Sequence, residues 1–445
     1  MRPIPLPGAA RISLPDNVNP VVQITARDHK PECTMAKLLM PVNHLITHST
    51  APHQWLRLIM LWLVCFSAVA TPDRQTIKAL YIPLADHYAG IVAYERYRSQ
   101  MIHADFKLEQ MKNWDLLRAY FLDDHADIAF VMSPLAMDMF QQKPEFRWIG
   151  LMHRDGSAMA INDLLNDQVQ LAPSRADRKP DSSLAKALTT NYLTRGRPTE
   201  IGMPHLLATH SVVLYQYLNQ QGVSLTLKPN RPAPVLLIPI APPKSPAYIK
   251  GLSNRAEPAA FVQSLPWADV VETGGFGHVA WYSKDVLPWP EGHVECIVLA
   301  QDRTIAEKFA ATQEVMKYIQ QAGRDIEIAR TTGGQPLDKI IQLIRKHIPA
   351  HTSEAIQASL DPNLRVINYN YLNIDKDGLK QVMDLAVEGG FLKTAVDINS
   401  FSDARFGTGF GQRPLEASST THNQQHPKAD TPGLKRIPRG SYLGS

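Results

Sequence analysis

The sequence predicts an α/β fold whose sheets are mostly parallel. Between residues 76 and 140, short apolar runs alternate with stretches of helical spacing, a pattern typical of strand–helix–strand units. Each apolar run leads directly into a polar or aromatic turn that opens a helix. Because open α/β sheets bind ligands at the carboxyl ends of their strands, these turns are the first place to look for a binding site.

Residues 77–152 are expected to form half of a doubly wound domain. Apolar, β-rich runs predict strands at residues 77–84, 106–111, 128–132 and 147–152. Asp86 is placed to cap a helix that runs to about residue 99. Asn113 or Asp115 can cap the next helix, and Ser133 can cap the one after it.

The rest of the chain continues the alternation. Strands are predicted at residues 200–203, 235–240, 260–263 and 296–300, and helices at 212–221, 304–321, 339–347 and 377–387. Gly222 is well placed as a C-cap, and Thr304 and Glu307 form a capping box. Residues 162–200 have little pattern, which indicates an irregular insertion or a helix.

Composition restricts the classes of function. The chain has 445 residues, 44% of them hydrophobic and 20% charged, which is typical of globular proteins. The net charge is only +4 and no Lys/Arg run occurs, so no nucleic-acid partner is expected. Cys33, Cys65 and Cys296 lack metal-ligand spacing, so we expect no disulfide framework, no zinc site and no cofactor.

The two ends differ from the body in composition. Residues 1–54 have no sustained period and are interpreted as disordered or as the result of a start codon placed too early. Residues 55–70 resemble a signal-peptide hydrophobic region, with cleavage after Ala70; an uncleaved anchor is the alternative. Either way the body lies outside the cytoplasm, in the periplasm. Residues 407–445 are predicted to be disordered.

Three motifs carry a family resemblance, at residues 83–90, 113–115 and 127–134. In this order they resemble the first lobe of type II periplasmic substrate-binding proteins of ABC importers, from the nitrate/sulfonate/bicarbonate (NMT1/THI5-like) group. The resemblance extends to about residue 406. It implies a two-lobed type II fold in which each lobe is a mostly parallel sheet flanked by helices.

The resemblance also implies a domain organisation. Lobe 1 would comprise residues 76–161 and 284–406, and lobe 2 would be the inserted segment 162–283. Binding proteins of this kind close about a hinge, and ligand contacts in both lobes stabilise the closed form.

In lobe 2 the most informative stretch is Thr209, His210 and Ser211. A helix N-terminus offers free N–H groups and a partial positive charge, so it can bind a small oxyanion. The resembling families have a similar Ser/Thr-His turn facing the cleft. The alternative is an ordinary N-cap followed by an exposed histidine.

In lobe 1 the candidates follow three expected strands. Asp86, His87 and Tyr88 form the first loop, where Tyr88 would be a wall and His87 a donor, although Asp86 can also act as a plain cap. Trp114 is either an aromatic wall or a core residue. Ser133 can donate to a ligand or to its own helix.

A second lobe 2 turn contributes Gln263 and Trp267. Trp267 matches the Trp of the Glu-Pro-Trp turn in the resembling families, but Leu265 stands where their Glu would be. A carboxylate that some relatives use to orient a ligand or metal is thus missing from this turn. Ligand identity therefore does not transfer from any one relative.

The expected function is that of an extracytoplasmic solute-binding protein, a monomer that delivers a small anion to the permease and ATPase of an ABC importer. One alternative ligand is a thiamine-precursor pyrimidine or another aromatic or cationic molecule. Another alternative role is as a ligand-sensing partner of a membrane kinase. No catalytic motif is apparent, and the cysteine-rich motif of the related thiamine-pyrimidine synthases is missing, so no enzyme is expected.

Overall fold

The computed structural model of the protein describes residues 73–406. The expectations for residues 1–54, the signal region 55–70 with its cleavage site, and the tail 407–445 lie outside the described residues. Within residues 73–406, none of the helices combines the length and the apolar character needed to cross a membrane.

The first sheet has the strand order β2-β1-β3-β12-β4. Its strands are β1 (Gln75–Tyr81), β2 (Ala104–Gln110), β3 (Ile128–Met132), β4 (Phe146–Leu151) and β12 (Cys296–Gln301). β1 runs parallel to β2 and β3, whereas β12 is antiparallel to both of its neighbours. Only β12 is therefore reversed, so its amino end lies at the same edge as the carboxyl ends of the other four.

The second sheet has the strand order β11-β6-β10-β7-β9-β8. Its strands are β6 (Ser157–Ile161), β7 (Thr199–Met203), β8 (Leu225–Thr226), β9 (Val235–Pro239), β10 (Ala260–Ser264) and β11 (His278–Tyr282). Here β6 is the single reversed strand, since it is antiparallel to β10 and β11 while the remaining pairs are parallel. Between the sheets, the short β5 (Arg154–Asp155) pairs with β13 (Ile367–Asn368).

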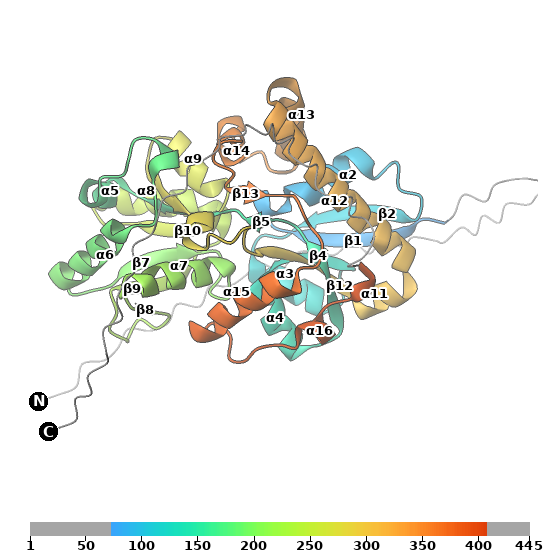
Figure 1. Cartoon of the computed structure of the whole chain (residues 1–445), viewed down its shortest axis with the longest axis horizontal. Helices are drawn as coiled ribbons and strands as arrows, with labels where there is room; N and C mark the ends of the chain where they lie inside the picture. The colour runs from blue at the N-terminus through green and yellow to red at the C-terminus, as the bar shows by residue number, and fades with distance from the viewer. Residues whose placement is uncertain (1–72, 407–445) are drawn as a thin grey trace, which may run out of the picture. The chain divides into compact units, whose positions relative to one another are not determined.

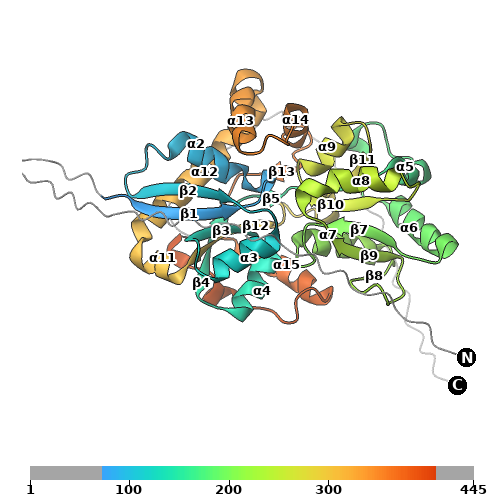
Figure 2. The same cartoon turned by 180° about the vertical axis from the view of Figure 1, so that it is seen from behind.

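Helices flank both sheets (Figures 1 and 2). They are α2 (Tyr88–Tyr97), α3 (Trp114–Leu122), α4 (Ser133–Gln142), α5 (Asp163–Val169), α6 (Ser182–Arg195), α7 (Thr209–Gln220), α8 (Ser245–Ser253), α9 (Trp267–Thr273), α10 (Ser283–Val286), α11 (Asp302–Glu307), α12 (Phe309–Thr332), α13 (Gly334–His347), α14 (Ser353–Ser359), α15 (Lys376–Glu388) and α16 (Ile398–Phe401). The long α12 packs against α2, β1 and β2, while α14 contacts α9 and α15 contacts both α4 and α7. Elements from the C-terminal part thus reach helices of both sheets.

The predicted α/β class with mostly parallel sheets is confirmed, and the eight expected strands are present within three residues of their predicted bounds. The sequence did not predict the strands β6 and β11. Residues 162–200 contain two helices, α5 and α6, rather than an irregular insertion. The C-cap of α7 is Gln221 and not Gly222 as predicted, but Gly222 follows it with a left-handed backbone, as a glycine just past a helix end commonly does.

Some capping predictions are wrong. Asp86 caps no helix: it lies inside a short 3-10 turn, Ala85–His87, and neither this turn nor α2 has a side-chain cap. Thr304 does not begin a helix, because α11 starts two residues earlier and the Thr304 hydroxyl donates to Asp127 instead. Asn113 does cap α3, accepting a hydrogen bond from Leu116 N.

Candidate ligand-binding site

A buried group of polar side chains lies where strand ends of the two sheets meet. We call it the central polar cluster, and it comprises Asp86, His153, His210, Ser264, Glu295 and Cys296, all fully buried. Ser264, the last residue of β10, donates its hydroxyl to Asp86 Oδ2 over 2.8 Å. Cys296, the first residue of β12, donates its thiol to the same oxygen over 3.4 Å. Asp86 therefore connects the two sheets directly.

His210 extends the cluster from the second sheet. Its Nε2 lies 2.9 Å from the Ser264 hydroxyl, and its Nδ1 lies 3.2 Å from Glu295 Oε1. The Ser264 hydroxyl has one proton, and it donates that proton to Asp86. In the contact between Ser264 and His210, the donor is therefore His210 Nε2–H. A neutral His210 then presents a bare Nδ1 to the Glu295 carboxylate, and neither atom has a hydrogen-bond partner.

The protonation states follow from burial and neighbouring charge. Burial alone would raise the pKa of Asp86, but three imidazoles, chiefly that of His153, outweigh burial and lower it to about 2. Burial lowers the pKa of His210, although Glu295 partly opposes this. Near neutral pH the cluster therefore contains an ionised Asp86 and a neutral His210.

A cationic histidine, His293, contacts the cluster member Glu295. His293 lies between two carboxylates, 2.7 Å from Asp155 and 3.0 Å from Glu295. Burial would lower the pKa of His293, but these two carboxylates raise it to about 9. The positive charge is thereby shared with Asp155 and Glu295 and does not neutralise Asp86.

Several atoms of the cluster have no hydrogen-bond partner. They are Asp86 Oδ1, Glu295 Oε1, His210 Nδ1 and both ring nitrogens of His153. Buried polar groups are normally hydrogen-bonded, because leaving one unpaired costs about 1–3 kcal/mol. Such a concentration of unpaired acceptors and imidazole nitrogens is what a site for a bound ligand would provide.

Aromatic side chains lie beside the cluster. The Tyr88 hydroxyl is 2.8 Å from Nδ1 of His351, and the ring of His351 meets that of Trp267 edge-on, with 4.8 Å between centroids. Trp267 also donates its Nε1 to Pro83 O over 3.1 Å, from the second sheet to the loop after β1. Tyr88 and Trp267, both predicted from the sequence, are thus joined through a histidine that was not.

His87 and Trp114 lie together under the loop after β1. Nδ1 of His87 is within hydrogen-bonding distance of the backbone N and O of Ile82, at 3.0 and 2.8 Å. Its ring packs edge-on against Trp114, with 5.9 Å between centroids. Both side chains are fully buried, and burial lowers the pKa of His87 to about 4.

The remaining predicted residues are Ser133, beside the first sheet, and Thr209, Ser211 and Gln263, in or beside the second sheet. The hydroxyls of Ser133 and Thr209 are 3.4 Å apart and bridge the two sheets. The hydroxyl of Ser211 is directed to His205 O instead. Gln263 donates to Ile240 O and leaves its own Oε1 unpaired.

The helix starts at α7 and α4 differ from the predictions in three respects. The N-cap of α7 is Ala208, with no side-chain cap, so Thr209 and Ser211 are not caps but belong to the first turn. Likewise α4 begins at Ser133 without a side-chain cap. The alternative of an exposed histidine at this turn is also wrong, because His210 is fully buried.

Sequence reasoning missed His153, Ser264, Glu295 and His351 as site residues and treated Cys296 as a lone thiol. Glu295 directly precedes β12 and Cys296 is its first residue, whereas the residues predicted from the sequence follow strands. Since β12 is reversed, its beginning meets the carboxyl ends of β1 and β3. His153 and His351 lie in connecting segments that carry no periodic pattern.

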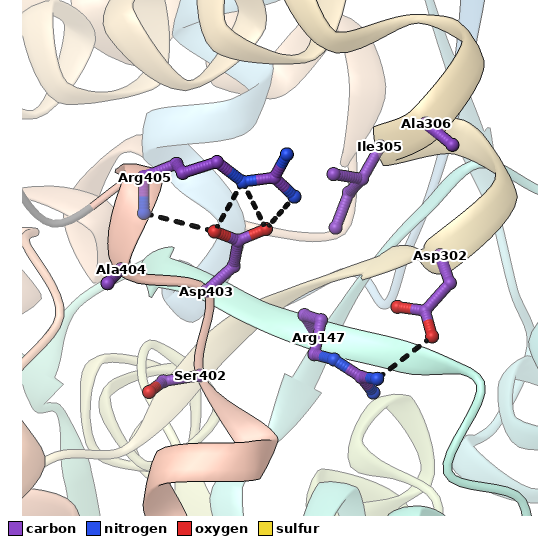
Figure 3. A pocket seen from close by; sticks show the side chains of 8 residues that line it. All are labelled: Arg147, Asp302, Ile305, Ala306, Ser402, Asp403, Ala404 and Arg405. Carbon is purple, nitrogen blue, oxygen red and sulfur yellow. Dashed lines mark hydrogen bonds and ion pairs between the residues drawn. The ribbon is translucent and has the colours of Figure 1, made fainter.

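A surface pocket of about 340 Å³ lies elsewhere, at the edge of the first sheet (Figure 3). Its charged lining is paired internally: Arg147 lies 3.1 Å from Asp302, and Arg405 pairs with Asp403 over 2.5 Å. None of the residues predicted to bind ligand lines it. The central polar cluster is therefore the better candidate site.

Comparison with known proteins agrees with the fold. The model of the NMT1-like family matches residues 70–335, more than half of the chain. A search of curated proteins finds no match.

Solved structures share the fold at low sequence identity. The nitrate-binding protein NrtA of Synechocystis PCC 6803 has 14% identity and a TM-score of 0.62, over 76% of this chain and 88% of its own. A zinc-bound ligand-binding component of an ABC-type import system from Staphylococcus aureus has 17% identity and a TM-score of 0.57, over 75% and 98%. The alkanesulfonate-binding protein SsuA of Xanthomonas axonopodis pv. citri, bound to MOPS, has 11% identity and a TM-score of 0.51, over 71% and 94%. These neighbours have the periplasmic-binding-protein fold, and each is named for binding a ligand rather than for catalysis.

Proposed function

Since the chain belongs to the NMT1-like family, we propose that it is an extracytoplasmic solute-binding protein that takes up a small solute at the central polar cluster. The observation that carries this proposal is a set of unpaired, fully buried polar atoms contributed by both sheets. Such a set is costly in an empty protein and becomes favourable when a ligand supplies the missing partners.

Hinge closure is the proposed mechanism. The expected division places lobe 1 at residues 76–161 and 284–406 and lobe 2 at residues 162–283. Because β6 (Ser157–Ile161) pairs within the second sheet, lobe 2 would instead begin at β6, and lobe 1 would close on it. Asp86 with Ser264 and Ser133 with Thr209 are polar pairs that join the two sheets directly, and each such pair would stabilise a closed form only modestly. A solute that contacts both lobes would add the differential affinity that shifts the population toward closure.

The chemistry of the unpaired atoms favours a solute that carries hydrogen-bond donors or positive charge. Asp86 Oδ1, Glu295 Oε1 and the bare His210 Nδ1 are all acceptors, and a bare anion would add a further acceptor to an ionised Asp86. A donor-bearing aromatic, such as an aminopyrimidine of the thiamine-precursor type, would meet these acceptors, with Tyr88 and Trp267 nearby as aromatic neighbours.

A small anion is the second candidate. Its support is the first turn of α7, a helix N-terminus at which the Thr209 hydroxyl lies 3.4 Å from that of Ser133. The structural neighbours named for nitrate and alkanesulfonate binding agree with this candidate. It requires the anion to approach α7 while remaining apart from Asp86.

The family resemblance also suggests how the bound solute would be delivered. The solute-loaded form would dock, as a monomer exported by the leader, on the permease and ATPase of an ABC importer. Docking on a membrane sensor kinase is the alternative destination for the same closed form. Docking on the importer and docking on the kinase both require a bound solute, so solute binding is tested first.

A thermal-shift screen tests the proposal. The chain is heated with nitrate, bicarbonate, ethanesulfonate and 4-amino-5-hydroxymethyl-2-methylpyrimidine, each in excess. A solute that binds the folded form raises the melting temperature in a concentration-dependent manner. We expect the aminopyrimidine to do so, and a screen in which no compound of either class shifts the melting temperature counts against the proposed ligand classes.

Charge variants then separate the two classes. Asp86→Asn removes the buried negative charge, and Asp115→Asn is the matched control because its side chain is largely exposed. A donor-bearing solute should lose about tenfold or more in affinity with Asp86→Asn. A small anion should bind that variant at least as well as the wild type. The control Asp115→Asn should leave the affinity for both classes of solute unchanged.

A further inference from the structure

Three different metal-ligand types converge within the central polar cluster. Among residues 73–406, Asp86, His153 and Cys296 each place one potential ligand atom within 4.8 Å of the other two. They come from separate segments: the turn after β1, the connection between β4 and β5, and the start of β12. All three side chains are fully buried.

The spacing fits a tetrahedral ion. Asp86 Oδ2 lies 3.5 Å from His153 Nε2 and 3.4 Å from Cys296 Sγ. With zinc bonds of about 2.0–2.2 Å to oxygen and nitrogen and about 2.3 Å to sulfur, neighbouring ligand atoms are about 3.3–3.6 Å apart. Two edges of the triangle thus already match, and the third, between His153 and Cys296, is at most 4.8 Å.

His153 supplies the independent observation that points to a ligand. Neither of its ring nitrogens has a hydrogen-bond partner, although the side chain is fully buried. Its Nε2 lies 3.5 Å from Asp86 Oδ2, within ion-pair distance, but the two atoms do not make a hydrogen bond. An imidazole nitrogen without a hydrogen-bond partner is what a metal ion requires of a histidine ligand.

The groups around the three ligands also suit a bound metal ion. The Ser264 hydroxyl donates to Asp86 Oδ2, as outer-shell partners commonly do for a ligating carboxylate. Three protein ligands leave the fourth tetrahedral position open, as in zinc sites that hold a water or an exchangeable ligand. Because Ser264 belongs to the second sheet, an ion at Asp86 would also be coupled to the contact between the sheets.

We infer that Asp86, His153 and Cys296 form a binding site for a divalent ion of the zinc class, with a fourth coordination position left for a water or an exchangeable ligand. A thiolate, an imidazole and a carboxylate together select zinc or cobalt over magnesium or calcium. The site goes beyond solute binding, since it is built from the protein alone. It departs from the expectation of no zinc site, which considered only the spacing of cysteines along the chain.

Cobalt provides a direct test, because a cobalt–thiolate bond produces a charge-transfer absorption that surface carboxylates and imidazoles do not. The full chain is treated with a chelator and titrated with Co²⁺ without added solute. Cys33→Ser and Cys65→Ser are introduced as the background, which leaves Cys296 as the only thiol. We expect saturable binding of one ion per chain with the charge-transfer band, and displacement of cobalt by Zn²⁺.

Variants assign the ligands. Cys296→Ser should abolish the charge-transfer band, and His153→Gln should weaken Co²⁺ binding by about tenfold or more, since even outer-shell partners of metal ligands are worth that much. His278→Gln is the matched control: this surface histidine pairs with Asp163 and should change nothing. If Cys296→Ser does not fold, the affinity of His153→Gln decides.

The inference is overturned if the background chain shows no charge-transfer band, or if His153→Gln binds cobalt as tightly as the background. Retention of the band in folded Cys296→Ser overturns it as well. None of these outcomes bears on solute binding, because the titration contains no solute. Conversely, a failed thermal-shift screen leaves the cobalt spectrum unaffected.

Discussion

Ser264, at the end of β10, donates a hydrogen bond to Asp86, in the turn after β1, over 2.8 Å, and both side chains are fully buried. The bond joins the second sheet to the first at the place where a ligand is expected in this fold. The same serine contacts His210, so one hydroxyl positions both a carboxylate and an imidazole of the cluster.

Removing this hydroxyl should weaken the contact between the sheets. Ser264→Ala deprives Asp86 of a partner and is expected to lower the free energy of unfolding by about 1–3 kcal/mol. Urea denaturation measures the loss. Ser99→Ala, an exposed serine after α2, is the matched control and should have no measurable effect. Equal stability of Ser264→Ala and the control would show that the contact adds nothing.

Asp127 should matter for stability and not for ligand affinity. It accepts hydrogen bonds from Lys78 N, Thr304 Oγ1 and Lys308 Nζ at 2.8–3.0 Å. It precedes β3 and so lies at the opposite edge from the cluster. Asp127→Ala should cost about 3 kcal/mol of unfolding free energy, because it leaves these donors unpaired.

The two readouts can be separated for this variant. Urea denaturation reports the stability loss, and calorimetric titration with the best solute of the screen reports affinity at a temperature where the variant is folded. A large loss of affinity with little loss of stability would contradict the structural role assigned to Asp127.

His351 should make stability depend on pH. Burial lowers its pKa from 6.5 to about 3 in the folded protein, so the unfolded chain binds a proton more readily than the native one. This contribution to stability is present above pH 6.5 and is lost as pH falls toward 3. Between about pH 7.5 and about pH 5 the loss amounts to about 2 kcal/mol.

The variant His351→Gln tests this contribution, since glutamine keeps a polar partner for Tyr88 but does not titrate. The unfolding free energy of the wild type should fall more between the two pH values than that of the variant, by about 2 kcal/mol. Parallel pH profiles for the two proteins would mean that His351 is not buried in its neutral form.

The leader prediction concerns residues outside those the structure describes. The sequence from Ala68 to Ala70 has the small-x-small pattern of a cleavage site. Mass spectrometry of the exported protein should therefore find an N-terminus near Thr71. A retained product that begins at Met1 would argue for an uncleaved leader or a cytoplasmic protein.

Much of the fold was predictable because its signals are local. Apolar runs such as residues 128–132 became strands, and the alternation with helices indicated a mostly parallel sheet. The reversed strand β6 and its partner β11 were missed because they depend on pairing between distant segments. No local pattern distinguishes a strand that runs against its neighbours.

The candidate site was predictable only in part. Tyr88, Thr209 and His210 were predicted because they follow strands at helix starts, and the structure places His210 in the central polar cluster with Tyr88 and Thr209 nearby. Glu295 was missed because only the reversal of β12 brings it to the ligand edge. The expected cap at Asp86 is absent, and its carboxylate accepts the tertiary hydrogen bond from Ser264 instead. The ligand-binding prediction for Asp86 stays a prediction.

His210 tests the central claim most directly, because it contacts both Ser264 of its own sheet and Glu295 of the other. Calorimetric titration with the solute found in the panel is carried out on the wild type, on His210→Ala and on the exposed control His125→Ala. If the solute binds at the cluster, His210→Ala should lose about tenfold or more in affinity while the control is unchanged. If His210→Ala binds the solute like the wild type, the central polar cluster is a structural feature and not the binding site.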